Sequence, residues 1–149
     1  MNKVDALKNS PLFEMLSQSE IEAISDLSKL RRFAPGETIF EEGDLGDSVY
    51  VIAGGEVDVL KHSEANGDRL LATLCERDFF GEMSLIDKEY RSATVRAKSE
   101  AQLLQLSAEN LVVFRKTYKD GFAFLVINIA RVLSSRLRET NQLLSKAAK

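Results

Sequence analysis

The chain has 149 residues, 44% of them apolar and 29% charged, which fits one globular domain spanning residues 1–149. Its formal net charge of −3 excludes the global basic field that attracts nucleic acid, and its single cysteine excludes an intrachain disulfide or a multi-cysteine zinc site. The sequence lacks a membrane-spanning apolar run and the apolar core of a signal peptide, so we expect a cytoplasmic protein that does not bind membranes.

Residues 1–28 are predicted to form N-terminal helices. Ser10 followed by Pro11 is a helix-start signal, because serine caps free N–H groups and proline fits the first helical position. Ser17 and Glu20 have the spacing of a capping box, which predicts a second helix start. The residues after it place apolar side chains at helical spacing: Ile21, Ile24, Leu27 and Leu30.

Residues 29–107 change to short alternating segments separated by turns that contain glycine. The segments predicted as strands are 30–33, 38–40, 48–52, 56–60, 69–74, 93–97 and 101–106. Gly54-Gly55 predicts a tight hairpin between two of them, and residues 64–68, with Asn66-Gly67, predict a second hairpin. Because the strands are too close in sequence for helical crossovers, we expect an antiparallel β-barrel or jelly roll. Cys75 follows the apolar run 70–74, and we expect it to be a small buried side chain.

Residues 108–147 are predicted to form C-terminal helices. The first covers about 108–117, Lys119–Gly121 breaks it, and the last runs from about Phe122 to Ser145. The last helix carries a seam with three- and four-residue steps: Val126, Ile129, Leu133, Leu137, Thr140, Leu144 and Ala147. The seam either docks on the barrel or pairs with a second copy, and we expect a homodimer through this helix. Thr140 inside an apolar seam should have a polar partner.

The segment Phe79–Thr94 has the residues of a phosphate cradle. Gly81 permits close backbone approach, and residues 82–86 can form one helical turn whose free N–H groups face an anion. Arg91 can add a two-pronged contact to phosphate oxygens. Glu82 is acceptor-only when ionised, so beside an anion we expect it to bind hydroxyl groups such as those of a sugar. An anion and a hydroxylated ring together indicate a nucleotide.

Residues 80–94 resemble the phosphate-binding cassette of cyclic-nucleotide-binding domains, the family of catabolite-activator-type regulators and regulatory subunits of cAMP-dependent protein kinase. The resemblance is carried by Phe80-Gly81-Glu82-Met83-Ser84-Leu85-Ile86 and Arg91-Ser92-Ala93-Thr94. Glycines at Gly43 and Gly55 also match glycine positions of that family. The resemblance implies an eight-stranded antiparallel jelly roll (a double-stranded β-helix) between N-terminal helices and a long C-terminal helix.

The resemblance also implies roles for single residues. Arg91 would pair with the cyclic phosphate, and Glu82 would accept a hydrogen bond from the ribose 2′-hydroxyl. The backbone N–H groups of Met83 and Ser84 would contact phosphate or sugar, and Ser92 would add a hydroxyl to phosphate or base. Gly81 and Ala93 complete the expected binding segment.

In the catabolite-activator branch, the C-terminal helix offers a threonine and the next polar residue to adenine, the latter across the dimer. Residues 135–141 resemble that segment, so Thr140 and Asn141 are candidate base contacts. Two departures from the family pattern are Arg77, where many relatives have glycine, and the turn 87–90, which lacks the usual glycine or proline.

The sequence argues against an enzyme and against a metal site. It has one histidine, His62, expected at an exposed strand end, whereas a cupin-type metal centre needs several converging histidines and carboxylates. No nucleophile has a paired base, and a phosphodiesterase would need a metal cluster or an acid–base pair. The chain ends soon after the long helix, so we expect a stand-alone sensor without a DNA-binding helix-turn-helix.

We therefore predict a regulatory domain with cAMP as its ligand and cGMP as the alternative. Binding would move the C-terminal helix over the base and pass the signal to the dimer mate or to a downstream effector protein. The alternative is an interaction module that keeps the fold without the ligand, with Arg91 and Glu82 simply paired to each other.

Overall fold

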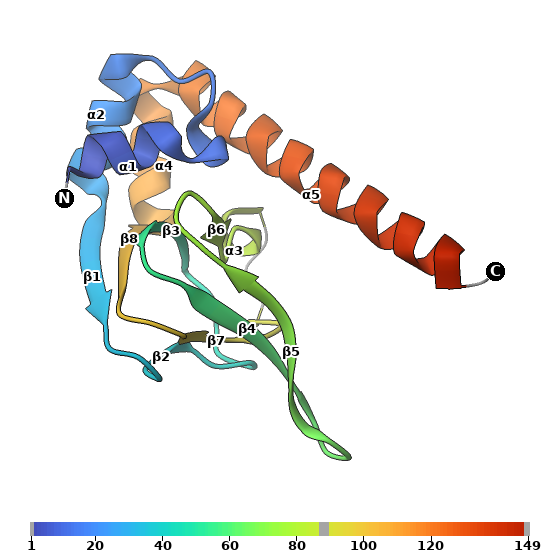
Figure 1. The fold of residues 1–149 in the computed structure, drawn as a ribbon. Helices are drawn as coiled ribbons and strands as arrows, with labels where there is room; N and C mark the ends of the chain where they lie inside the picture. Colours follow the sequence, from blue (N-terminus) through green and yellow to red (C-terminus); the bar gives the residue numbers. More distant parts are fainter. Residues whose placement is uncertain (1, 87–89, 148–149) are drawn as a thin grey trace.

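The computed structural model describes residues 2–86 and 90–147 and places a two-sheet β roll beneath a layer of helices (Figure 1). The described strands form two four-stranded antiparallel sheets in the orders β1-β8-β3-β6 and β2-β7-β4-β5. The strands are β1 (Lys29–Phe33), β2 (Thr38–Phe40), β3 (Ser48–Gly54), β4 (Val57–Ser63), β5 (Gly67–Leu74), β6 (Phe79–Phe80), β7 (Thr94–Ala97) and β8 (Ala101–Ser107). The predicted fold class, an eight-stranded antiparallel roll with flanking helices, is confirmed.

The helices lie before, within and after the roll. They are α1 (Lys3–Asn9), the 3₁₀ helix η1 (Pro11–Phe13), α2 (Gln18–Leu27), α3 (Met83–Ile86), α4 (Ala108–Thr117) and α5 (Lys119–Ala147). No helix in the described part of the chain is long and apolar enough to span a membrane.

Both predicted N-terminal caps are present. The Ser10 hydroxyl accepts a hydrogen bond from the backbone N–H of Leu12 over 3.3 Å, which starts η1. At the start of α2 the Ser17 hydroxyl accepts from the N–H of Glu20 over 3.2 Å, and the Glu20 carboxylate accepts from the N–H of Ser17 over 2.8 Å. This reciprocal pair is the predicted capping box.

The predicted hairpin at Gly54-Gly55 is wrong. β3 pairs with β6 and β8, whereas β4 pairs with β5 and β7, so the chain changes sheet at this turn. Gly55 has φ +82, and a Cβ there would collide with the carbonyl oxygen of Glu100. The second predicted hairpin is confirmed, since β4 and β5 pair down to Ser63 and Gly67.

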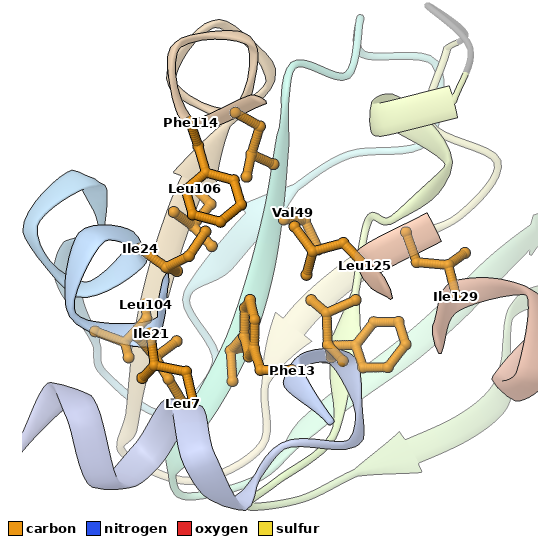
Figure 2. Close-up of a cluster of buried hydrophobic side chains, with 14 residues drawn as sticks. Leu7, Phe13, Ile21, Ile24, Val49, Leu104, Leu106, Phe114, Leu125 and Ile129 are labelled. Atoms are coloured by element: carbon orange, nitrogen blue, oxygen red, sulfur yellow. The ribbon is translucent and has the colours of Figure 1, made fainter. Parts of the chain in front are cut away.

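Strand β3 is buried on both faces and separates two apolar clusters. Val49 and Val51 pack with the helices (Figure 2), while Tyr50 and Ile52 pack between the two sheets. Alternate residues of a strand point to opposite faces, so one strand serves both clusters. Phe79 of β6 and Leu104 and Leu106 of β8 belong to the first cluster, and the helices α1, η1, α2, α4 and α5 complete it with Leu7, Leu12, Phe13, Ile21, Ile24, Leu111, Phe114, Leu125 and Ile129.

The break between the last two helices falls at Tyr118, between Thr117 and Lys119, rather than at Lys119–Gly121. Gly121 lies in the first turn of α5 and is buried there. A Cβ at this position would collide with the carboxylate of Glu20 and lie 3.1 Å from the ring of Phe114, so the glycine permits close packing of α5 against α2 and α4.

The apolar seam of α5 divides into a packed part and an exposed part. Ile129 is buried and Leu133 packs against the same cluster, so the first part docks on the domain. Leu137 and Leu144 are 61% and 64% exposed, on the part of α5 that extends beyond the roll (Figure 1). The hydroxyl of Thr140 donates to the carbonyl of Arg136 over 3.0 Å, so its polar partner is its own helix.

Cys75 is exposed, so the predicted buried position is wrong. It follows β5, which is the edge strand of its sheet and is largely exposed along its length. The nearby charge of Asp78 is the main cause that raises the pKa of the Cys75 thiol above its usual value. A thiol that stays protonated is a weak nucleophile.

Candidate functional site

The cassette continues from β6 into Gly81, the residue directly after this strand. Gly81 has φ +80, and a Cβ there would lie 2.8 Å from both Nη1 of Arg91 and the carbonyl oxygen of Ser48. The single turn α3 follows, with the N–H of Ser84 donating to the carbonyl of Gly81 over 3.2 Å. The expected glycine and helical turn are therefore present, and the glycine lets the backbone pass close to the arginine.

Arg91 is buried and held by protein groups. Its Nη2 donates to the carbonyl of Ser48 over 2.8 Å, and its Nη1 donates to the hydroxyl of Ser84 over 2.9 Å and to the carbonyl of Gly81 over 3.4 Å. The guanidinium carbon lies 4.0 Å from the ring centroid of Phe40, in cation–π geometry. Burial lowers the pKa of the Arg91 guanidinium, but arginine remains charged at neutral pH.

The loop between β2 and β3 holds the backbone of Arg91. The N–H of Arg91 donates to the carbonyl of Asp44 over 2.6 Å, and the N–H of Gly43 donates to the carbonyl of Arg91 over 2.9 Å. A Cβ at Gly46 of the same loop would collide with the Ser84 hydroxyl and lie 2.9 Å from Nε of Arg91. The guanidinium is thus fixed from several sides before any ligand arrives.

Arg91 retains donors for an anion. A guanidinium has five N–H donors, and within residues 2–86 and 90–147 the hydrogen bonds of its side chain involve Nη1 and Nη2 only. A fixed, charged group with spare donors is suited to bind a phosphate.

Glu82 pairs with α5 rather than with Arg91. The residue is buried, and its Oε1 lies 3.4 Å from Nη1 of Arg136. The guanidinium of Arg136 also lies 5.9 Å from the ring centroid of Phe79. The sequence-based alternative, in which Glu82 and Arg91 pair with each other, does not describe this site.

A cavity of about 340 Å³ lies beside these groups, within the usual size range of small-molecule sites. Seven predicted site residues line it: Gly81, Glu82, Met83, Ser84, Arg91, Ser92 and Ala93. An apolar wall from the sheet β2-β7-β4-β5 completes it: Val59, Ala72, Leu74 and Val95. One cavity therefore combines a cationic end, a carboxylate and an apolar surface.

Thr140 and Asn141 are not among the residues that line this cavity, and both are exposed on α5. Thr140 follows Arg136 by four residues, so the two occupy the same face of the helix. Their role as base contacts remains a prediction.

Eight residues that line the cavity are not among the predicted site residues: Phe40, Val59, Ala72, Leu74, Phe80, Tyr90, Val95 and Arg136. Arg136 lies within residues 135–141, where the resemblance assigns base contacts to Thr140 and Asn141 only, and it is 54 residues from Glu82 in the chain. The four-residue spacing to Thr140 was the available signal, since it places both residues on one helical face.

The sequence departs from the family pattern at Arg77 and in the turn 87–90, and the structure describes Arg77 and Tyr90. Residues 87–89 lie outside the described residues, while Tyr90 lines the cavity and is 72% exposed. Arg77 has φ +86, and its Nε donates to the carbonyl of Asn9 at the end of α1 over 3.1 Å. A left-handed arginine is unusual, and this contact ties the turn to the N-terminal helix.

Residues 2–86 and 90–147 contain no group of three or more histidine, cysteine or carboxylate side chains placed to hold a metal ion. His62 pairs with Asp68 at the exposed end of β4, over 3.2 Å between Nδ1 and Oδ1.

Comparison with known proteins finds relatives along most of the chain. Residues 30–118 match the family model described as the cyclic nucleotide-binding domain. The chain is 35% identical over 136 residues to the cyclic AMP receptor protein of Thermus thermophilus, covering 91% of this chain and 61% of that one. It is 36% identical over 134 residues to a cAMP-dependent protein kinase regulatory subunit of Mycosarcoma maydis, covering 90% of this chain and 24% of that one.

The fold is also shared with a solved structure. The crystal structure of the Thermus thermophilus catabolite activator protein superposes with a TM-score of 0.80 at 32% identity, covering 93% of this chain and 63% of that one. The chain thus spans less than two thirds of the length of these relatives. The family-model match over residues 30–118, the sequence relatives and the shared fold lead to one conclusion: the chain belongs to the cyclic nucleotide-binding domain family.

Proposed function

We propose that this domain is a sensor that binds a cyclic purine nucleotide, with cAMP as the first candidate and cGMP as the alternative. The observation that carries the proposal is the buried guanidinium of Arg91, fixed at one end of a cavity of about 340 Å³. Burying a charge is costly unless it has partners, and this one retains N–H donors for an anion. A cyclic phosphate is an anion of suitable size and charge.

The sugar would lie at Glu82. Its carboxylate is nearly buried and lines the same cavity as Arg91, so a hydroxyl beside the phosphate can reach it. The resemblance to the family supports the same assignment. Backbone N–H groups of Met83 and Ser84, at the start of α3, add donors for phosphate or sugar.

The base would pack on the apolar wall formed by Val59, Ala72, Leu74 and Val95. A purine is an apolar, planar group with polar edges, and such a wall accepts either adenine or guanine. Both sequence relatives described above are named for cyclic AMP, which supports cAMP as the first candidate. Thr140 and Asn141 would reach the base edge when α5 moves, the latter in the partner chain of a dimer.

A movement of α5 would transmit the signal of ligand binding. Arg136 links this helix to Glu82, the residue proposed to hold the ribose, so ligand binding and helix position compete for one carboxylate. A ligand shifts such an equilibrium only through its different affinity for the two arrangements. The exposed part of α5, with Leu137 and Leu144, would carry the change to a second copy or to an effector protein.

A thermal-unfolding panel tests the proposal. Excess cAMP or cGMP should raise the Tm, because a ligand that binds only the folded state stabilises it by mass action. The matched control is 5′-AMP, which keeps the base and ribose but opens the phosphate ring. The absence of any shift with millimolar cAMP and cGMP would contradict ligand binding and favour the alternative, an interaction module that works through the exposed leucines of α5.

A further inference from the structure

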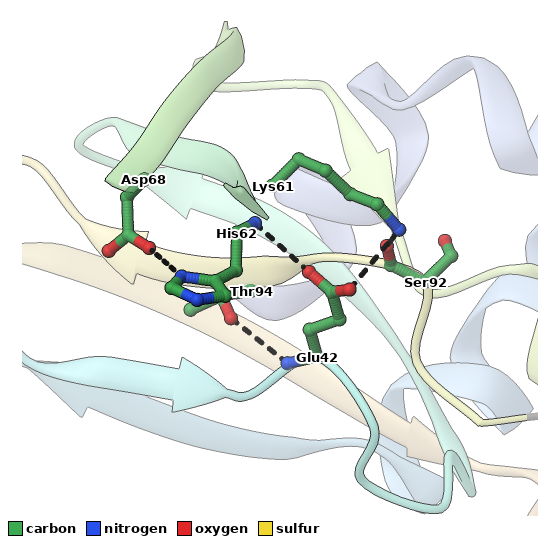
Figure 3. Close-up of polar contacts among 6 residues, drawn as sticks. All are labelled: Glu42, Lys61, His62, Asp68, Ser92 and Thr94. Atoms are coloured by element: carbon green, nitrogen blue, oxygen red, sulfur yellow. Dashed lines mark hydrogen bonds and ion pairs between the residues drawn. The ribbon is translucent and has the colours of Figure 1, made fainter. Parts of the chain in front are cut away.

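Lys61 lies at the edge of the candidate site but is not one of the residues assigned to it. It belongs to β4, in which Val57 is buried and Val59 lines the cavity. Alternate residues of a strand share a face, so Lys61 lies on the same face as these two valines. Its ammonium group donates to the carbonyl oxygen of Ser92 over 2.8 Å (Figure 3).

Glu42 holds the ammonium group of Lys61 in place. Oε2 of Glu42 lies 3.2 Å from Nζ of Lys61, and Oε1 accepts a hydrogen bond from the backbone N–H of His62 over 3.1 Å (Figure 3). The backbone N–H of Glu42 donates to the hydroxyl of Thr94 over 2.9 Å. The segment from Ser92 to Thr94, which follows Arg91 directly, is therefore held at one end by the Lys61 ammonium and at the other by the backbone N–H of Glu42.

We propose that Lys61, oriented by Glu42, is a positioning residue for the anion end of the cavity. The peptide between Ser92 and Ala93 is planar and trans, so a carbonyl held by Lys61 directs the N–H of Ala93 the opposite way. Ala93 lines the cavity, and no hydrogen bond to its N–H is found within residues 2–86 and 90–147. Lys61 thereby fixes one more donor for a bound anion and polarises the peptide that carries it. This inference rests on the proposed function.

Arg69 provides a control for the loss of positive charge at Lys61. Arg69 is the register partner of Lys61 on β5 and is exposed, and no ion pair or hydrogen bond of its side chain is found among the described residues. Removing its charge changes the electrostatic field near the hairpin about as much as removing that of Lys61. Arg69→Met does not affect the hydrogen bond to the Ser92 carbonyl. It therefore distinguishes the loss of a positive charge from the loss of the hydrogen bond that positions this peptide.

The experiment compares Lys61→Met, Lys61→Arg and Arg69→Met with the unaltered chain by cAMP titration. Lys61→Met should weaken binding about tenfold, the order of one charge-assisted hydrogen bond. Lys61→Arg, which keeps a donor and a charge, should restore most of the affinity. Arg69→Met should change it by less than about twofold, as expected of an exposed charge. Equal losses in Lys61→Met and Arg69→Met, or no loss in Lys61→Met, would overturn the proposal.

A second measurement needs no ligand. The ¹H–¹⁵N resonance of Ala93 should shift in unliganded Lys61→Met and not in unliganded Arg69→Met, because only the first loses the bond to the adjoining carbonyl. An unchanged Ala93 resonance in Lys61→Met overturns the positioning role even if cAMP binds. If the unaltered chain binds no cyclic nucleotide, the proposed function fails, and the resonance still decides whether Lys61 orients this peptide.

Discussion

Nη1 of Arg136 lies 3.4 Å from Oε1 of Glu82, so the long last helix is joined directly to the first acidic residue of the cassette. The Glu82 side chain is 9% exposed and that of Arg136 is 45% exposed. The pair thus connects a buried site to a helix that extends beyond the roll, which gives the proposed sensor a physical link between ligand and output.

Arg136→Met should loosen α5 without removing the cavity. The partly exposed ion pair contributes about 0–1 kcal/mol, so the Tm should fall only slightly. Amide hydrogen exchange in the unliganded variant should become faster around residues 130–140, because the contact to the cassette is lost. Arg138→Met is the control, since residue 138 is an exposed arginine of the same helix. Equal exchange in both variants would show that the Glu82 contact does not hold α5.

Gly46→Ala should damage the site from the loop side. The new methyl group would collide with the hydroxyl of Ser84 and lie 2.9 Å from Nε of Arg91, both of which are held in place. We expect a loss of about 1–3 kcal/mol in stability and weaker ligand binding.

Gly54→Ala is the matched control for this substitution. The nearest atom to its Cβ is the side-chain oxygen of Gln102 at 3.0 Å, which can move. Gly54→Ala should therefore reduce stability and cAMP affinity less than Gly46→Ala does, as measured by chemical unfolding and cAMP titration. Similar behaviour in both variants would mean that Gly46 is not constrained by the site.

Asn128→Ala should destabilise the packing of η1 on α5. The Asn128 side chain is buried and donates from Nδ2 to the carbonyls of Leu12 and Glu14, each over 2.8 Å. Its removal leaves two carbonyls without these donors, which costs about 1–3 kcal/mol and lowers the Tm by roughly 3–10 °C. Asn141→Ala, on the exposed end of the same helix, should leave the Tm unchanged. A neutral Asn128→Ala would show that these hydrogen bonds add no net stability.

Glu42 should make stability depend on pH in the acid range. The hydrogen bond from the backbone of His62, followed by that from Lys61, lowers the pKa of Glu42 below 4.5. A carboxyl whose pKa is lower in the folded state stabilises the fold above the unfolded value, and this contribution disappears as the pH falls through the folded value.

Urea midpoints measured between pH 6 and pH 3 test this dependence. Glu42→Gln should flatten the curve in the region around and below pH 4.5, whereas Glu64→Gln, at an exposed turn, should leave it unchanged. An unaltered pH dependence in Glu42→Gln would contradict the stabilising role of the ion pair.

The structural features that the sequence predicts well are determined by residues close to one another in the chain. Ser17 and Glu20 of the capping box are three positions apart, and Gly81 and Arg91 of the cassette are ten positions apart, so their geometry follows from local spacing. Strand alternation gave most strand positions for the same reason.

The structural features that the sequence does not predict depend on how elements distant in the chain pack together. Gly55 reads as a hairpin residue, but it moves the chain from one sheet to the other, which depends on the pairing of β3 with β8. Cys75 ends an apolar run, but it follows an edge strand. Arg136 reaches Glu82 only because α5 crosses the cassette, which no local pattern specifies.

Calorimetric titration of the unaltered chain and of Arg91→Lys with cAMP tests the central claim most directly. The unaltered chain should bind one nucleotide per chain. Arg91→Lys, which keeps the charge but loses the two-pronged geometry, should bind at least about tenfold more weakly with an unchanged circular dichroism spectrum. Failure of the unaltered chain to bind, or equal affinity in the folded variant, would contradict an Arg91-centred cyclic nucleotide site.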